Sequence, residues 1–169
     1  RDLQDRADRI AQVLVKDMGV VPGNRVLLRA PNNPMLAACW FAAMKAGAIA
    51  VATMPLLRAK ELKAIIDIGR VTHALCDASL ADELRLASSS LDLRLFNTSG
   101  DGSLEASMQR HDERFIAINT AADDTCLLAF TSGTTGVPKA TMHFHRDVIA
   151  SCRCWPPHVL RPDADDVFI

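Results

Sequence analysis

The segment RVLLRAPNNPMLAACWFAAMKAGAIAVAT, residues 25–53, contains the pattern that decides the predicted fold. Its first five residues, Arg25–Arg29, carry three successive apolar side chains and are typical of a short buried strand. Asn33 and Pro34 then have the residue types of a helix N-cap and a first helical position, and an Ala-rich run follows them. Residues 48–53 are again typical of a strand. The segment therefore predicts a strand, a helix and a second strand in succession.

The sequence on both sides of this segment continues the alternation. Residues 3–14 and 57–68 place apolar side chains at helical spacing, and a short strand at 72–76 is followed by a weaker helix at 79–87. Strands that alternate with helices are typical of an α/β fold, in which a mostly parallel sheet carries helices on both faces. This is the predicted fold class.

Three parts are predicted along the chain. Residues 1–110 form the α/β layer, which ends in a surface turn at 97–102 and a short helix at 103–110. Residues 111–124 are polar and irregular, so a connector is expected there. Residues 125–169 are predicted to hold a strand, a phosphate-binding loop, a second strand and a following helix.

The composition excludes several classes of protein. A hydrophobic content of 49% with 23% charged residues is that of an ordinary globular protein. A net charge of −1 gives no reason to expect nucleic acid or an anionic membrane surface as a partner. The longest apolar stretches fall short of the roughly 20 residues that a membrane span requires. The five cysteines are odd in number and most lie in apolar runs, which favours a reducing, cytoplasmic setting over a disulfide framework.

The loop at residues 131–139 carries the strongest chemical information. It reads TSGTTGVPK, with four hydroxyl side chains, two glycines and a lysine in nine residues. Glycines let backbone N–H groups approach an anion closely, hydroxyls donate to phosphate oxygens or bind Mg²⁺, and Lys139 supplies a mobile positive charge. The alternative is a surface turn of the same residue types. The lysine directly after Pro138 favours polyphosphate binding over that alternative.

The loop does not follow the Walker A pattern. Lys139 follows Gly136 by three positions, and Ala140 stands where that pattern has Ser or Thr. Residues 140–144 are expected to be extended, so no helix follows the loop directly. The anion is therefore expected to bind a loop between two strands.

The same segment resembles, residue for residue, the signature of the adenylate-forming superfamily, which includes acyl-CoA synthetases, luciferases and peptide-synthetase adenylation domains. Its usual form is [ST]-S-G-[ST]-T-G-x-P-K-G, and the one departure is Ala140 where Gly is usual. Residues 139–148 look most like ligases of benzoate and 2-aminobenzoate. Other segments resemble the superfamily's large N-terminal domain, so residues 1–169 are expected to be a part of that domain; these segments are 3–14, 23–28, 44–51 and 141–146.

The resemblance implies a reaction in two steps. A carboxylate attacks the α-phosphate of Mg²⁺-bound ATP and expels pyrophosphate, and the thiol of coenzyme A then attacks the acyl-adenylate and releases AMP. It also implies that Lys139 neutralises charge on the leaving pyrophosphate and that Thr135 lies near Mg²⁺. The residues implied in nucleotide binding are Thr131, Ser132, Gly133, Thr134, Thr135, Gly136 and Lys139.

The superfamily's remaining motifs would follow Ile169. They supply an aromatic site for adenine, a Glu for Mg²⁺, an Asp for the ribose and a C-terminal catalytic Lys. The chain is therefore expected to be a fragment without activity of its own. Two alternatives stay open: an adenylation domain that loads a carrier protein, and a non-catalytic nucleotide-binding module.

Two further clusters contain residue types that can bind metals, but metal binding is the less favoured interpretation of both. His143 and His145 are two residues apart, which on a strand would place both side chains on one face, but no third ligand is found at a suitable spacing. Cys152 and Cys154 lie near His158, yet one intervening residue is fewer than the usual two to four between zinc-binding cysteines. Structural or substrate-adjacent roles are expected for the two histidines, and metal binding is not expected at the Cys152, Cys154 and His158 cluster.

Overall fold

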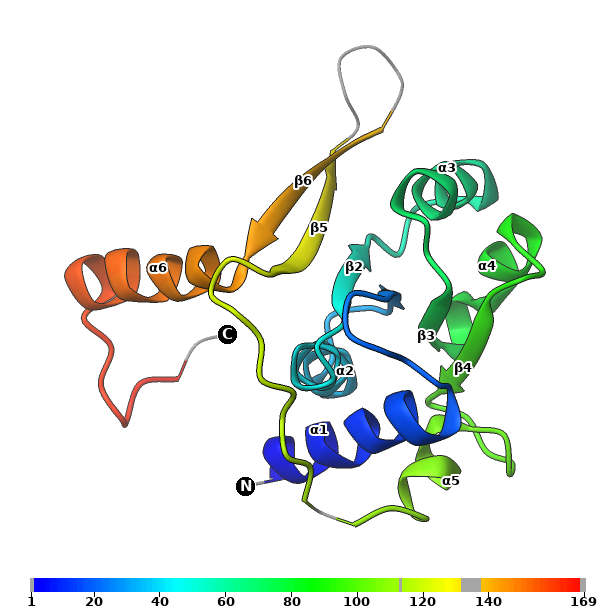
Figure 1. The fold of residues 1–169 in the computed structure, drawn as a ribbon, viewed down its shortest axis with the longest axis horizontal. Helices are drawn as coiled ribbons and strands as arrows, with labels where there is room; N and C mark the ends of the chain where they lie inside the picture. Colours follow the sequence, from blue (N-terminus) through cyan, green and yellow to red (C-terminus); the bar gives the residue numbers. More distant parts are fainter. Residues whose placement is uncertain (1, 113, 132–137, 168–169) are drawn as a thin grey trace.

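The structure, a computed structural model, describes residues 2–112, 114–131 and 138–167 (Figure 1). Within these residues one sheet contains six strands, namely β1 (Arg25–Arg29), β2 (Ile49–Thr53), β3 (His73–Asp77), β4 (Asp92–Phe96), β5 (Thr125–Thr131) and β6 (Lys139–Phe144). The helices are α1 (Asp2–Gln12), α2 (Pro34–Lys45), α3 (Ala59–Gly69), α4 (Ala81–Ala87), α5 (Leu104–Met108) and α6 (His145–Trp155). Three shorter helical turns are η1 (Val13–Asp17), η2 (Ala78–Leu80) and η3 (Pro156–Leu160).

The strand order is β4-β3-β1-β2-β5-β6. The first five strands are parallel, and β6 pairs antiparallel with β5. One face of the sheet packs on α1, α2 and α5, while the other packs on α3 and α4. The predicted α/β class, with a mostly parallel sheet and helices on both faces, is confirmed.

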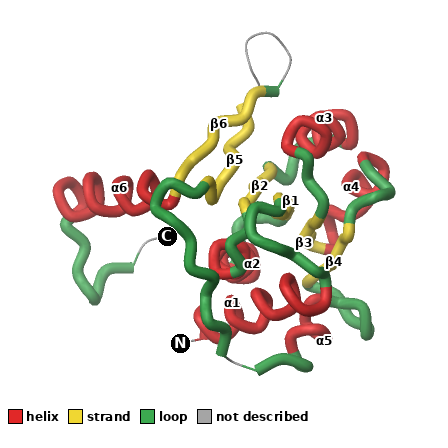
Figure 2. The backbone as a smooth tube through the Cα atoms, viewed as in Figure 1, coloured by secondary structure: helices red, strands yellow, loops and turns green. Residues whose placement is uncertain are grey.

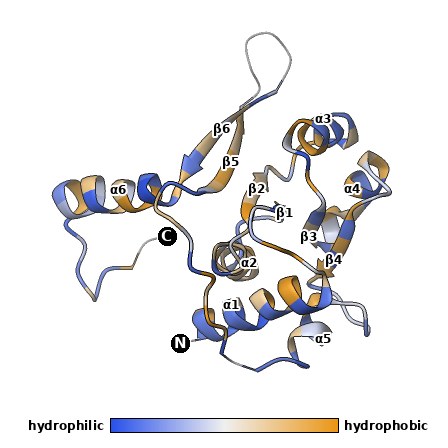
Figure 3. Cartoon of the chain, in the orientation of Figure 1, coloured by the Kyte–Doolittle hydropathy of each residue, from blue (hydrophilic) through white to orange (hydrophobic). Residues whose placement is uncertain are grey.

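Successive side chains of β1 contribute in turn to two apolar clusters, one on each face of the sheet. Val26 and Leu28 belong to the apolar cluster under α1 and α2, whereas Leu27 belongs to the cluster under α3 and α4. Successive side chains of a strand point to opposite faces, so a strand that is buried on both sides reads as a continuous apolar run. In Figure 3, β2 beside it is coloured as strongly hydrophobic.

The predicted start of α2 is confirmed. Asn33 lies just outside the helix in an extended conformation, and its side-chain oxygen accepts a hydrogen bond of 2.9 Å from the backbone N–H of Leu36. Pro34 occupies the first helical position, where its missing N–H costs no intrahelical bond. This cap fixes where the chain turns after β1.

No strand is predicted from the sequence at 92–96, and the structure adds β4 there. Leu93 and Leu95 pack against the cluster under α3 and α4, and Phe96 is fully buried on the opposite face. The helix expected at 79–87 is also divided into η2 and α4.

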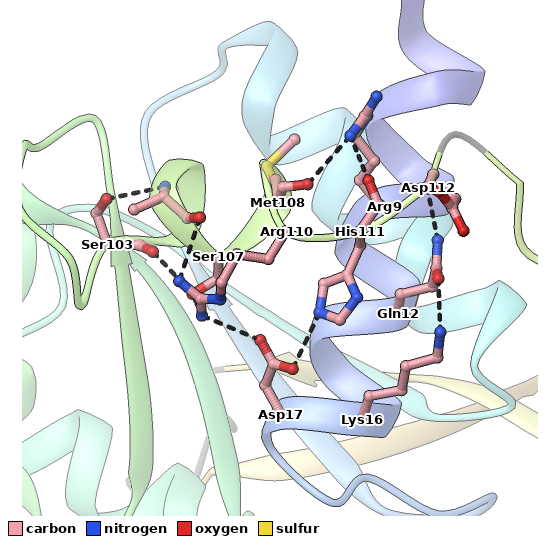
Figure 4. Close-up of polar contacts among 11 residues, drawn as sticks. Arg9, Gln12, Lys16, Asp17, Ser103, Ser107, Met108, Arg110, His111 and Asp112 are labelled. Atoms are coloured by element: carbon pink, nitrogen blue, oxygen red, sulfur yellow. Dashed lines mark hydrogen bonds and ion pairs between the residues drawn. The ribbon is translucent and has the colours of Figure 1, made fainter.

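Polar contacts hold the connector after α5 against α1 (Figure 4). Arg9 donates to the carbonyl oxygens of Met108 and His111, and Gln12 donates to that of Asp112 at 2.6 Å. Asp17 accepts from His111 Nε2 at 2.9 Å. The connector must cross the width of the sheet from β4 to β5, and these contacts set its path along α1 (Figure 1).

The five cysteines fall into two groups. Cys39, Cys76 and Cys126 are buried, whereas Cys152 and Cys154 on α6 are exposed. Burial raises the pKa of the Cys76 thiol to about 12 and also raises the pKa values of Cys39 and Cys126. A thiol with a raised pKa holds little of the reactive thiolate near neutral pH.

A thiol reagent at pH 8 is therefore expected to modify two cysteines of the native chain quickly and the other three only after unfolding. The measurement is mass spectrometry of the protein during labelling with a maleimide. Rapid modification of Cys39 or Cys76 in the native protein would contradict the packing described above.

Candidate functional site

The segment singled out in the sequence lies at the tip of the β5–β6 hairpin. β5 ends at Thr131 and β6 begins at Lys139, and these two residues are direct partners across the hairpin. The hairpin projects beyond the helical layers (Figures 1 and 2). As expected, a strand ends where the segment begins, and a second strand, not a helix, begins where it ends.

The site residues inside the segment lie outside the described residues: Ser132, Gly133, Thr134, Thr135 and Gly136. Its glycines and few internal contacts also predict that the segment is mobile or poorly ordered without nucleotide, and this expectation falls on the same residues, outside those described. Of the predicted site, Thr131 and Lys139 are described, and both are exposed.

Thr131 and Lys139 share one face of the hairpin because directly opposed residues of an antiparallel pair point the same way. Thr141 and His143 follow on that face of β6, since each lies two residues further along the strand. The Thr141 hydroxyl donates to the carbonyl oxygen of Ala129 at 3.2 Å and lies 3.2 Å from His143 Nε2. These polar side chains form a row that begins with the lysine, and we call it the β6 polar row: Lys139, Thr141 and His143.

Thr141 is not among the site residues predicted from the sequence. The pattern in the sequence that could have placed Thr141 beside Lys139 is the alternation of polar residues at 139, 141 and 143 along an expected strand. The Lys139 end of the row suits an anion, because the Lys139 ammonium and the hydroxyl of Thr131 opposite it can both donate to phosphate oxygens, whereas the Thr141 hydroxyl already donates to Ala129. The exposed face of the hairpin thus fits a polyphosphate at its Thr131–Lys139 end.

On the opposite face of the hairpin, the β5 residues pack against the body of the protein, whereas Ala140 and Met142 of β6 are exposed. Phe130 packs against the apolar cluster under α3 and α4, and a Cβ added to Gly69 at the end of α3 would lie 3.5 Å from its ring. Leu128 of β5 is buried in the same cluster. The apolar face therefore holds the hairpin while the polar row remains accessible.

The base of the hairpin is fixed by polar contacts. The backbone N–H groups of His145 and Arg146 donate to the carbonyl oxygens of Asp124 and Ala122 at 3.2 and 3.0 Å. The Arg146 guanidinium forms an ion pair with Asp123 and lies over the Phe144 ring, 5.1 Å from its centroid. These contacts tie the start of α6 to the end of the connector.

The possible metal clusters are not assembled. His143 lies in β6 whereas His145 begins α6, so the two do not share a strand. Among the residues that the structure describes, no group of three or more His, Cys, Asp or Glu side chains is placed to hold a metal ion. None of the described helices is long and apolar enough to cross a membrane.

Known proteins with similar sequences include CoA ligases. The chain is 31% identical over 152 residues to the long-chain-fatty-acid–CoA ligase FadD13 of Mycobacterium tuberculosis, a match that covers 88% of this chain and 30% of the relative. It is 33% identical over 155 residues to the anthranilate–CoA ligase of Pseudomonas aeruginosa, covering 86% of this chain and 29% of that protein. The chain thus spans about 30% of the length of the curated relatives that it matches.

Solved structures show the same fold. The anthranilate CoA ligase AuaEII, in complex with anthranoyl-AMP, superposes with a TM-score of 0.84 at 24% identity, covering 94% of this chain and 31% of that one. ATP-bound MatB from Rhodopseudomonas palustris superposes with a TM-score of 0.78 at 28% identity, covering 88% and 30%. The fold is therefore that of a part of these ligases.

The family comparison covers the chain from end to end. The family described as AMP-binding enzyme matches residues 1–169, which include the β5–β6 hairpin and its TSGTTGVPK segment. With the mostly parallel sheet, the hairpin geometry and the relatives in agreement, this chain belongs to the AMP-binding enzyme family.

Proposed function

We propose that the chain is part of an ATP-dependent carboxylate–CoA ligase that acts on an aromatic acid such as benzoate or 2-aminobenzoate. The observation that carries the proposal is the pairing of Thr131 with Lys139, which closes the TSGTTGVPK segment at the tip of an exposed hairpin. Support for the aromatic acid comes from the 33% identity to an anthranilate–CoA ligase. Coenzyme A as acceptor is supported by the ligase relatives.

In this proposal the hairpin handles the phosphates of ATP. Lys139 lies against the β- and γ-phosphates and neutralises the charge that builds up on departing pyrophosphate, which is how fixed charges lower a barrier without covalent chemistry. The hydroxyls of Thr131, Ser132, Thr134 and Thr135 donate to phosphate oxygens, with Gly133 and Gly136 allowing close approach of the backbone. Thr135 would help to hold the Mg²⁺ carried with ATP, and this ion would supply further charge neutralisation.

Buried free thiols and the use of ATP and coenzyme A fit a cytoplasmic enzyme. The test of the proposed function is a panel of acids with ATP and coenzyme A on the polypeptide that contains this chain together with the remaining length of its relatives. Formation of an aryl-CoA supports the proposal. An acyl-adenylate that is passed only to a carrier protein would favour the alternative adenylation domain, and no adenylate with any acid would favour a non-catalytic nucleotide-binding module.

Residues 1–169 alone are expected to form no acyl-adenylate and to bind ATP weakly. The chain spans about 30% of its relatives, and the hairpin supplies phosphate contacts without those for adenine and ribose that the family carries elsewhere. The measurement is exchange of labelled pyrophosphate into ATP in the presence of the acid panel. Exchange above the background without protein would show that these residues are sufficient.

A further inference from the structure

Arg29, the last residue of β1, is a charged side chain in the interior of the protein. It is 1% exposed and lies on the α3 and α4 side of the sheet, as its alternation with Leu28 requires. Burial lowers the pKa of its guanidinium, although an arginine keeps its charge at any ordinary pH. The proposed reaction does not use this residue.

The guanidinium donates to four backbone carbonyl oxygens. Nη1 donates to Met54 at 3.0 Å, and Nη2 donates to Pro55 at 3.1 Å and to Leu57 at 2.8 Å. Nε donates to Leu80 of η2 at 3.2 Å. Three of the four bonds therefore go to residues 54–57, the loop that joins β2 to α3.

This loop leaves the sheet at the same edge as the phosphate-binding segment. β2 and β5 are parallel neighbours in which Val51 lies opposite Leu128, so Met54 and Thr131 each follow three residues further in the same direction. Leu57 of the loop and Phe130 of β5 also pack against the same apolar cluster. A displacement of the loop would therefore disturb the surface on which the packed face of the hairpin rests.

Stability alone is a weak explanation for an arginine at this position. A buried charge carries a desolvation cost, and an apolar residue of similar volume often gives an equally stable protein. What an apolar residue cannot do is satisfy four carbonyl oxygens at fixed positions, so the loop would have to move until water reached them. The guanidinium thus determines where the loop lies more than how stable the fold is.

We infer that Arg29 is a positioning residue for ATP: by fixing residues 54–57 it holds the support behind Phe130 and keeps the paired residues Thr131 and Lys139 of the hairpin in their productive place. The inference rests on the proposed function, since it assigns Arg29 a part in nucleotide binding at that site. Arg29 acts from the packed face of the hairpin and does not contact the phosphates.

The test compares Arg29→Met, Arg29→Lys and a control in the polypeptide that carries this chain with the remaining length of its relatives. Arg29→Met is expected to raise the KM for ATP about tenfold, a modest effect for a displaced binding element, while the KM for the acid stays near the wild-type value. Arg29→Lys keeps the charge but reaches fewer carbonyls, so an intermediate KM is expected. Hydrogen exchange is measured on the same proteins and should be faster at both 54–58 and 129–131 in Arg29→Met.

The matched control is Asp8→Asn on the other face of the sheet. Asp8 is 3% exposed and accepts from Lys45 Nζ, so the substitution also removes a buried charged contact but leaves residues 54–57 untouched. It should lower the melting temperature without changing the KM for ATP or the exchange at 129–131. An unchanged KM for ATP in Arg29→Met, or an equal rise in Asp8→Asn, overturns the inference.

The hydrogen-exchange readout separates this inference from the proposed function. If the wild-type protein forms no adenylate with any acid, the proposed function fails, and the exchange pattern alone decides on Arg29. Faster exchange at both 54–58 and 129–131 in Arg29→Met then supports the coupling of loop and hairpin. Faster exchange confined to 54–58 overturns it.

Discussion

Replacing Lys139 with alanine in the proposed full-length ligase is expected to slow acyl-adenylate formation by roughly 10²–10³, equivalent to about 2.7–4 kcal/mol of transition-state stabilisation. Lys139 stands at the exposed end of the β6 polar row, directly across from Thr131, where it can reach an anion held by the loop. Its charge matters most when pyrophosphate departs, so kcat should fall much more than the affinity for the carboxylic acid. Pyrophosphate exchange with a saturating acid measures this step.

The second half-reaction provides the control. Transfer of a preformed acyl-adenylate to coenzyme A should proceed at nearly the wild-type rate in Lys139→Ala, because pyrophosphate has already left. Lys139→Arg should restore adenylation only in part, since a planar fork replaces a compact point charge. Equal slowing of both half-reactions would mean that Lys139 does not act selectively on pyrophosphate departure.

The parts of the fold that could be predicted are those encoded by local pattern. The strand, capped helix and strand of residues 25–53 were readable because Asn33 and Pro34 mark a helix start and because the strands on both sides are apolar. The two strands around the loop were readable in the same way, from an apolar run and an extended one. Such signals depend on neighbouring residues and need no knowledge of the tertiary structure.

Strand β4 was missed because its pattern is short and half polar. Leu93 and Leu95 alternate with Asp92 and Arg94, which is the period of a strand with one buried face, but over five residues it is hard to separate from a loop. Its conformation is decided by pairing with β3, in which each partner residue, such as His73 opposite Asp92, lies 19 positions earlier in the sequence. The antiparallel direction of β6 was likewise left open by a prediction that specified only a mostly parallel sheet.

The residues around the candidate site also differ in whether the sequence alone could reveal them. The phosphate-binding segment is continuous in sequence, so its residue types could be recognised without a structure. Arg29 could not be recognised, because an arginine at the end of the run RVLLR looks like the solvent-facing end of a strand. Its role depends on three carbonyls from 54–57 and one from residue 80, which only the tertiary structure brings to it.

A second buried charge leads to the largest expected change in stability. Asp8 of α1 is 3% exposed and accepts a hydrogen bond from Lys45 Nζ at the end of α2, so the pair joins the two helices on one face of the sheet. Lys45→Met would leave the Asp8 carboxylate buried without its cationic partner. Removing one member of a buried pair typically costs about 3–5 kcal/mol, and the lower end is expected here because the Lys45 side chain is 26% exposed.

For a protein of this size, a loss of about 3 kcal/mol lowers the melting temperature by roughly 6–12 °C. The double variant Asp8→Asn with Lys45→Met should regain most of that loss, because no charge remains buried without a partner, although the amide still requires a hydrogen bond. Urea denaturation of the wild type, both single variants and the double variant gives the coupling free energy. Asp8→Asn alone should be the milder single change, since the Lys45 ammonium can turn toward solvent on its flexible chain. If the two single losses simply add in the double variant, the pair is not coupled, and the link between α1 and α2 must come from their apolar contacts alone.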